Sequence, residues 1–138
     1  MSFRLSFDPA EQQLDVIHGF LTESYWSPGI PRETVASALA QSLTVCAFDG
    51  DNQIGMARVV TDRATMAYLA DVFVLETHRR QGVARAMIEA LYQHPDLHGL
   101  RRWFLFTRDM QPVYASVGWE QFPYPERLMI RDNPDAYR

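Results

Sequence analysis

The stretch VLETHRRQGVARAMIEAL, residues 74–91, joins an apolar run directly to a helix-like pattern. Arg79 and Arg80 precede a lone glycine, Gly82, at the join. The apolar residues after Gly82 recur at helical spacing, which predicts a helix packed by one face on a sheet. The first turn of a helix carries unpaired amides and the positive end of the dipole, so it attracts anions. The join is therefore the best candidate in this chain for a pyrophosphate site, although solvated arginines beside an ordinary loop glycine would give the same pattern.

The glycine and its neighbours refine this hypothesis. Gly82 has no Cβ where a phosphate would approach the backbone, and Arg85 adds a further positive charge. The stretch lacks the G-x-x-x-x-G-K-[ST] loop and the three glycines of a dinucleotide fingerprint. The pattern therefore favours some other kind of phosphate site.

Length and composition indicate a single globular domain over residues 1–138, with 47% hydrophobic residues. A net charge of -4 gives no support to binding of nucleic acid or of an anionic membrane. No apolar run approaches the length of a membrane span and no signal peptide is evident, so we expect a cytoplasmic protein. The lone cysteine, Cys46, lies in an apolar strand-like run and reads as a buried thiol.

Periodicity and turn signals predict the remaining elements. Asp8, Pro9 and Glu11 form a helix-start signal, and Asp49 to Asn52 form a hairpin turn. The predicted order is strand 3–7, helix 9–22, helix 32–42, strands 43–48 and 53–60, strand 65–75, helix 83–91, strand 101–107, helix 109–117 and a closing strand pair, 118–122 and 126–131. This order indicates a mixed α/β sheet with helices on its faces.

Two segments of this chain resemble signatures of the GNAT superfamily of N-acetyltransferases. VFVLETHRRQGVARAMIEAL (72–91) is similar to the acetyl-CoA signature R/Q-x-x-G-x-G/A, with Arg79, Gly82 and Ala84 at the specified positions. VYASVGW (113–119) is similar to the second landmark, a tyrosine followed by Gly-Phe, with Trp119 in place of Phe. The resemblance implies a GNAT-like fold: a central mixed, mostly antiparallel sheet of about six to seven strands with four helices on its faces.

The resemblance also implies that the cofactor is acetyl-CoA and indicates where it binds. Backbone groups of Val72, Phe73 and Val74 would pair with the pantetheine arm, and Thr107 stands where the family often has a pantetheine-binding Asn. Arg79 would lie at the rim of the pyrophosphate site. Amides of the following turn would hold the pyrophosphate itself: Arg80, Gln81, Gly82, Val83, Ala84 and Arg85.

Two residues are candidates for catalysis. By the resemblance, Tyr114 would protonate the leaving thiolate, and a phenol is acidic enough for that task; the alternative is an amphipathic core residue. Polyamine acetyltransferases carry Glu where this chain has Ala70, so Asp71 is the nearest carboxylate. Regular strand alternation would place Ala70 and Asp71 on opposite faces. Asp71 is thus either catalytic or a structural hydrogen-bonding acid.

The segment ESYWSPGIPRE (23–33) is the candidate acceptor site. Tyr25 and Trp26 would form an aromatic wall, and Glu23 or Glu33 would pair with the charge of an amine; alternatively, the two aromatics cap the core. The histidines are scattered without ligand spacing, so no metal is expected.

We therefore expect an acetyl-CoA-dependent N-acetyltransferase that acts on a primary amine of a small molecule by direct attack in a ternary complex. The alternatives are a non-catalytic acyl-CoA-binding sensor or regulatory module, and a peptide or protein N-acetyltransferase. Related folds pair through their last strands, and the apolar ERLMIR segment (126–131) would permit a homodimer.

Overall fold

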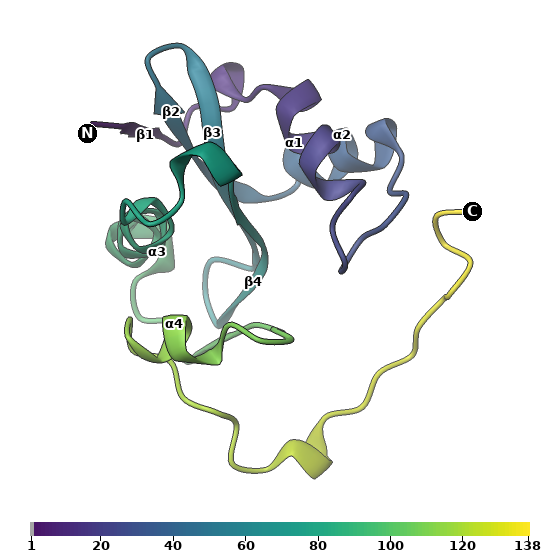
Figure 1. The fold of residues 1–138 in the computed structure, drawn as a ribbon. Helices are drawn as coiled ribbons and strands as arrows, with labels where there is room; N and C mark the ends of the chain where they lie inside the picture. The colour runs from purple at the N-terminus through teal and green to yellow at the C-terminus, as the bar shows by residue number, and fades with distance from the viewer. Residues whose placement is uncertain (1) are drawn as a thin grey trace.

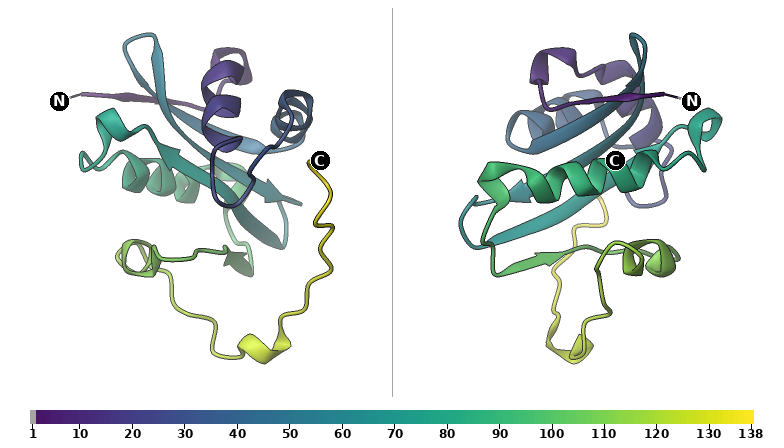
Figure 2. Two further views of the ribbon diagram at one scale, coloured as in Figure 1. Left: turned by 45° about the vertical axis from the view of Figure 1, so that its right-hand side comes forward. Right: turned by 90° about the vertical axis from the view of Figure 1, so that its left-hand side faces the viewer.

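The computed structural model describes residues 2–138, and a five-stranded sheet forms its centre (Figures 1 and 2). The strands follow one another across the sheet in chain order, and neighbours run antiparallel except for the parallel pair β4–β5. The predicted mixed, mostly antiparallel sheet is therefore confirmed. Its strands are β1 (Arg4–Ser6), β2 (Leu43–Asp49), β3 (Asn52–Thr61), β4 (Met66–Val74) and β5 (Arg102–Phe104).

Helices cover both faces of this sheet (Figure 2). α1 (Leu14–Leu21) and α2 (Arg32–Ala40) pack on one face, where their apolar residues meet Phe48, Met56 and Phe73. α3 (Val83–Gln93) packs on the other face, and the short α4 (Gln111–Ala115) follows β5. Single 3-10 turns occur at Pro9–Glu11, Glu76–His78, Pro95–Leu97 and Pro125–Arg127. Both helix layers bury the stripes that the apolar spacing predicts.

The first predicted helix is split in two. Asp8 caps Pro9–Glu11 through its carboxylate, which accepts a hydrogen bond from the Ala10 amide at 2.9 Å. The chain then becomes extended at Gln13, whose amide donates to Oε1 of Gln53 at 2.8 Å, and α1 begins one residue later. The interruption therefore comes from a tertiary contact with β3 that helix-start signals do not encode.

The predicted closing strands, 118–122 and 126–131, do not form strands in residues 2–138. Residues 120–138 instead run as an open loop outside the body, with one 3-10 turn, and their end returns beside Gly29; all of them are exposed (Figure 1). A strand needs a hydrogen-bonded neighbour, and this tail does not fold back onto β5. The sheet therefore has five strands in place of the six to seven expected.

Two further features concern the chain as a whole. Cys46 lies buried in β2, and burial raises the pKa of its thiol to about 12, as suits a packing residue. No helix within residues 2–138 is both long enough and apolar enough to span a bilayer.

Candidate active site

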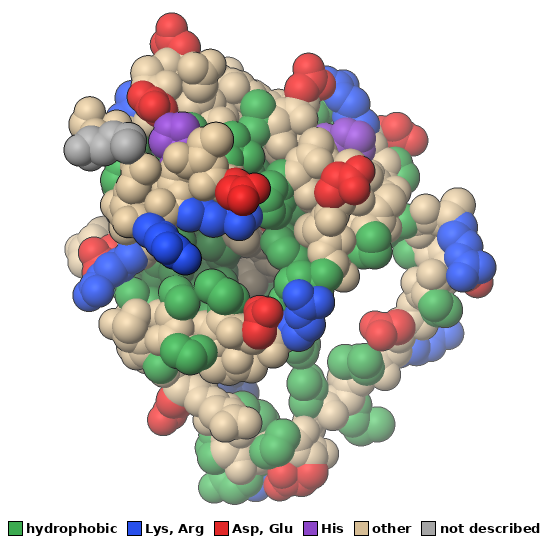
Figure 3. Space-filling model, viewed as in Figure 1, with side chains coloured by type: hydrophobic (Ala, Val, Ile, Leu, Met, Phe, Trp, Pro, Cys, Tyr) green, Lys and Arg blue, Asp and Glu red, His purple; other side chains and the backbone are tan. Residues whose placement is uncertain are grey.

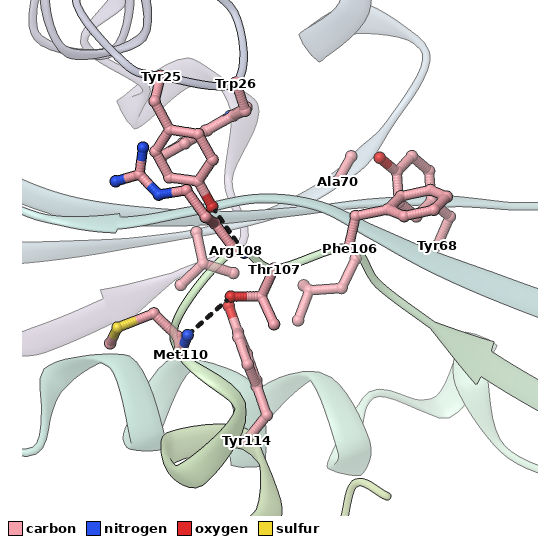
Figure 4. A pocket seen from close by; sticks show the side chains of 11 residues that line it. Tyr25, Trp26, Tyr68, Ala70, Phe106, Thr107, Arg108, Met110 and Tyr114 are labelled. Carbon is pink, nitrogen blue, oxygen red and sulfur yellow. Dashed lines mark hydrogen bonds between the residues drawn. The ribbon is translucent and has the colours of Figure 1, made fainter. Parts of the chain in front are cut away.

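The site lies where β4 and β5 separate. The two strands pair only over Met66–Tyr68 and Arg102–Phe104, and beyond these residues they are no longer hydrogen-bonded to each other. A cavity of about 310 Å³ opens between them (Figure 4). Its walls come from the α1–α2 loop, β4, the segment after β5 and α4: Tyr25, Trp26, Tyr68, Leu69, Ala70, Val72, Phe106, Thr107, Arg108, Met110 and Tyr114.

A β-bulge shapes the β4 wall of this cavity. Arg58 pairs with Asp71 and Val59 pairs with Leu69, so Ala70 is the extra residue on β4. A bulge bends its strand and interrupts the ladder, so the simple alternation expected for residues 70 and 71 does not apply here. It turns Asp71 toward the side of the sheet on which the α1–α2 loop lies.

Asp71 is the centre of a buried polar network. Its Oδ1 accepts a hydrogen bond from Nε1 of Trp26 at 2.7 Å, and its Oδ2 accepts one from Nε of Arg58 at 2.7 Å. Arg58 also donates to Oγ of Ser42 at 3.0 Å. The side chains of Asp71 and Arg58 are only 8% and 17% exposed. Because both carboxylate oxygens are engaged by donors, the geometry favours the structural reading of Asp71 over the catalytic one.

Five of the eleven residues that line the cavity are aromatic (Figure 4). Tyr25 meets Trp26 edge to face at 5.1 Å, and its hydroxyl accepts the backbone N–H of Arg108 at 3.2 Å. The Arg108 guanidinium carbon lies 4.0 Å from the Tyr25 ring centre. Phe106 lies edge-on to Tyr68 at 5.8 Å. Ring contacts and one cation–π pair thus hold this wall together, and its surface suits a ligand with apolar or flat parts.

Tyr114 rises from α4 into the cavity (Figure 4). Burial raises the pKa of its phenol, and the nearby Tyr25 raises it further. Its hydroxyl makes no hydrogen bond to any of residues 2–138, whereas Oγ1 of Thr107 accepts the Met110 amide at 3.1 Å at the start of α4. Tyr114 therefore remains protonated at neutral pH and has a proton to donate into the cavity.

The free edge of β4 leads from the cavity toward α3. The Leu75 amide donates to the Ile54 carbonyl at 2.7 Å, so alternation directs the Phe73 amide to β3 and the Val72 and Val74 amides to the open edge. The Phe73 side chain is buried and stacks on Phe20. Of the three predicted pantetheine contacts, Val72 and Val74 thus have available amides.

The turn before α3 presents a run of unpaired amides. Arg80 and Gly82 have positive φ values of 64° and 79°. The first helical bond joins the Ala86 amide to the Gly82 carbonyl at 3.0 Å, and within residues 2–138 the amides of 80–85 find no acceptor. When residues with a left-handed backbone conformation alternate with residues in other conformations, their successive amides form a concavity that binds anions. This concavity lies at the positive end of the α3 dipole.

The arginines around this turn have separate contacts. Nε of Arg79 donates to the Val74 carbonyl at 3.1 Å and ties the turn to the end of β4. Arg85 pairs with Glu89 at 3.1 Å along the exposed side of α3. In the view of Figure 3, basic side chains lie beside a hollow at the centre of the molecule, together with acidic ones. The backbone amides of the turn are therefore the main feature that favours an anion.

The sequence of residues 8–119 matches the model of the acetyltransferase (GNAT) family. The chain belongs to the GNAT acetyltransferase family. A Gibberella zeae protein named provisionally as an acetyltransferase is 27% identical where the two sequences align, and the alignment covers 83% of this chain and 76% of that protein.

Solved GNAT structures share the fold. A crystal structure of a GNAT-family protein from Xanthomonas campestris pv. campestris is 38% identical, covers 99% of this chain and 97% of its own, and gives a TM-score of 0.94. The aminoglycoside N-acetyltransferase AAC(6')-Iy in complex with CoA is 20% identical, covers 96% and 94% of the two chains, and gives a TM-score of 0.68. The second likeness concerns the fold alone.

This GNAT chain brings five of the candidate residues together around one cavity. Tyr25, Trp26, Thr107 and Tyr114 line the cavity with Val72, whereas Glu23 is exposed and lies outside its lining. Residues 2–138 contain no cluster of His, Cys, Asp or Glu that could hold a metal. Sequence reasoning missed several residues of the site: Arg58, Tyr68, Phe106, Arg108 and Met110. Alternation from Ala70 points to Tyr68, but no local signal marks Arg58 or Arg108.

Proposed function

We propose that this GNAT protein transfers an acetyl group from acetyl-CoA to a primary amine of a small molecule, by direct attack in a ternary complex. One observation carries the proposal: free backbone amides run from the turn at 80–85 along the open edge of β4 to a cavity that contains Tyr114. A diphosphate, an extended amide-bearing arm and a reactive thioester follow one another in the same order in acetyl-CoA.

The diphosphate would be held by the amides of 80–85 and the pantetheine arm by the open edge at Val74. Backbone donors at a helix start suit phosphates because they are fixed in direction and need no side-chain ordering. Since Val72 lines the cavity and Val74 does not, the Val72 amide is the better candidate to polarise the thioester carbonyl. The Val74 amide is then available to bind the pantetheine arm.

In the transfer step, the amine nitrogen attacks the thioester carbon and the carbon–sulfur bond breaks. The thiolate takes the phenolic proton of Tyr114, whose raised pKa keeps that proton in place at neutral pH, and the tyrosinate left behind then regains a proton from water. The proton lost by the amine passes to water, because the cavity lining has no carboxylate among residues 2–138 and Asp71 already accepts two hydrogen bonds. Orienting two bound reactants supplies much of the rate in such a site.

The cavity also bears on the class of acceptor. Its volume of about 310 Å³ and its aromatic walls suit a small molecule with an apolar or flat part. A peptide acceptor would favour an open acidic groove, whereas the lining offers one charged side chain, Arg108. These features favour a small-molecule amine over a protein tail.

Tyr114→Phe tests the chemistry separately from binding. Release of thiol from acetyl-CoA would be followed with a panel of amines, amino acids, aminoglycosides and peptides, and the variant compared on the best acceptor. We expect kcat to fall by about 100-fold, the usual contribution of a positioned acid, with unchanged affinity for coenzyme A. An unchanged kcat would remove the acid role. Tight coenzyme binding without thiol release for any amine would favour a sensor.

A further inference from the structure

The cavity between β4 and β5 holds a single charge, and that charge is positive. Among the eleven lining residues, all of them within 2–138, Arg108 alone has an ionised side chain. Asp71 lies outside the lining and pairs with Arg58 at 2.7 Å, so these two buried charges compensate each other. The other polar groups of the lining are hydroxyls, which can donate to an anion: those of Tyr25, Tyr68, Thr107 and Tyr114. The cavity therefore suits a negatively charged group and repels a cation.

The Arg108 guanidinium is held in place while its donors stay free. Its central carbon lies 4.0 Å from the Tyr25 ring centre, and the Tyr25 hydroxyl accepts the Arg108 backbone N–H at 3.2 Å (Figure 4). Within residues 2–138 the nearest carboxylate is that of Asp109, which is 3.8 Å away and too distant for a hydrogen bond. Both of these side chains are largely exposed, so their attraction is weak. A planar guanidinium with free donors can bind a carboxylate through two parallel hydrogen bonds.

The rest of the lining is apolar or aromatic, and it comes from the α1–α2 loop, β4 and the segment after β5: Trp26, Leu69, Ala70, Val72, Phe106 and Met110. A ligand that fits this cavity of about 310 Å³ thus needs a carboxylate for Arg108 and an apolar or flat part for these walls. The proposed transfer adds a primary amine. An amino acid with an apolar or aromatic side chain combines all three groups in one small molecule.

We propose that the acceptor is such an amino acid and that its carboxylate pairs with Arg108. This inference rests on the proposed acetyl transfer and names its substrate class. The amine nitrogen forms the new bond to the acetyl carbon and gives a proton to water, while the carbon–sulfur bond breaks and the thiolate takes the proton of Tyr114. The products are an N-acetylamino acid and coenzyme A, and the carboxylate takes no part in the step. Polyamines and aminoglycosides, which carry several positive charges, are poor acceptors for this cavity.

Acceptors that differ only at the carboxylate test the inference. Thiol release from acetyl-CoA would be compared for phenylalanine, leucine and methionine, each beside its own amide, and for spermidine. The amine of an amino acid amide is less basic than that of the acid, so more of it is in the neutral form that attacks, and intrinsic reactivity favours the amides. We nevertheless expect kcat/KM of the best amino acid to exceed that of its amide at least about 10-fold, because only the acid makes a charge-assisted pair. Spermidine should be slower than either.

Arg108→Gln should remove this preference. We expect KM for the amino acid to rise at least about 10-fold and its ratio of kcat/KM to that of the amide to fall within about threefold of one. Arg4→Gln is the matched control, because the Arg4 guanidinium carbon lies 4.4 Å from the Phe48 ring centre on the opposite edge of the sheet. That variant removes the same charge and the same kind of ring contact outside the cavity, so the preference should persist.

The outcomes separate this inference from the proposed function. Equal kcat/KM for acids and amides, or a preference that survives Arg108→Gln, would overturn the inference and leave acetyl transfer intact. Absence of thiol release with every acceptor would instead contradict the proposed function. Calorimetry with phenylalanine on protein saturated with coenzyme A would then test Arg108 alone: binding that Arg108→Gln abolishes would support the carboxylate site, and no binding, or equal binding by the variant, would overturn it.

Discussion

Replacing Asp71 by asparagine should loosen the aromatic wall of the cavity and leave coenzyme binding intact. In the natural protein the carboxylate joins Trp26 to Arg58 through two hydrogen bonds of 2.7 Å. An asparagine keeps one oxygen acceptor and turns an N–H₂ donor toward either the indole N–H or the guanidinium. One of the two bonds is therefore lost, together with the charge that compensates Arg58.

The cost can be estimated from the surroundings. Removing one partner of a buried ion pair costs about 3–5 kcal/mol. The lower end applies here because Arg58 keeps its bond to Ser42 and is 17% exposed. We therefore expect a loss of about 3 kcal/mol in the free energy of unfolding, or roughly 10 °C in Tm for a domain of this size. Glu89→Gln, which breaks the exposed Arg85–Glu89 pair, should cost no more than about 0.5 kcal/mol.

Kinetics separate a positioning role from a catalytic one. If Asp71 acts by holding Trp26, Asp71→Asn should raise KM for the amine and lower kcat by less than about 10-fold, whereas loss of a general base costs about 100-fold or more. In a Trp26→Phe background the same substitution should have a much smaller effect on KM, because the two residues form one unit. The reasoning would be refuted if Asp71→Asn cost as little stability as Glu89→Gln, or if the effects of Asp71→Asn and Trp26→Phe on KM were additive. A 100-fold loss of kcat at constant KM would instead restore Asp71 as a catalytic base.

Two further predictions follow from local geometry. Gly55→Ala would place a Cβ 2.9 Å from the Phe73 carbonyl oxygen, so the free energy of unfolding measured in urea should fall by about 1–3 kcal/mol. Gly19→Ala is the control, because a Cβ there has no neighbour within 4 Å and should not destabilise the protein. Equal urea midpoints for the two variants would contradict the close packing of β3 on β4. The pKa of Tyr114 is raised above 10, so its proton is present below that pH and is lost only as the pH rises through the higher value. The profile of kcat against pH should therefore rise with deprotonation of the amine and show no falling limb below pH 10, and a fall between pH 7 and 9 would exclude Tyr114 as the acid.

The parts of the fold that the sequence predicts are those with strong local signals. The helix after Gly82 and the hairpin around Gly50 each combine an apolar period with a turn residue, and both lie where expected. The unpaired amides at the start of α3 are also predictable from sequence, because every helix leaves its first amides without an intrahelical acceptor. The GNAT family is likewise readable from two short segments.

The features that escaped prediction depend on residues far apart in the chain. Gln13 interrupts the first helix by bonding Gln53, and Asp71 on β4 accepts a hydrogen bond from Trp26 in the α1–α2 loop. The bulge at Ala70 is a property of two strands together and leaves no mark on β4 alone. Residues 118–122 and 126–131 read as strands because their apolar residues have strand-like spacing, but a strand needs a hydrogen-bonded neighbour, and neither segment pairs with β5. Local periodicity identifies an element and does not identify its partner.

The central claim is that the amides of 80–85 bind the diphosphate of coenzyme A, and titration calorimetry tests it most directly. Coenzyme A should bind the natural protein, while pantetheine, which lacks the diphosphate, should bind at least about 100-fold more weakly. Gly82→Val should weaken coenzyme A binding, since a branched side chain at a φ of 79° strains the turn, and Tyr114→Phe should leave it unchanged. Folded protein that gives no heat with coenzyme A, or that binds pantetheine equally well, would contradict the claim.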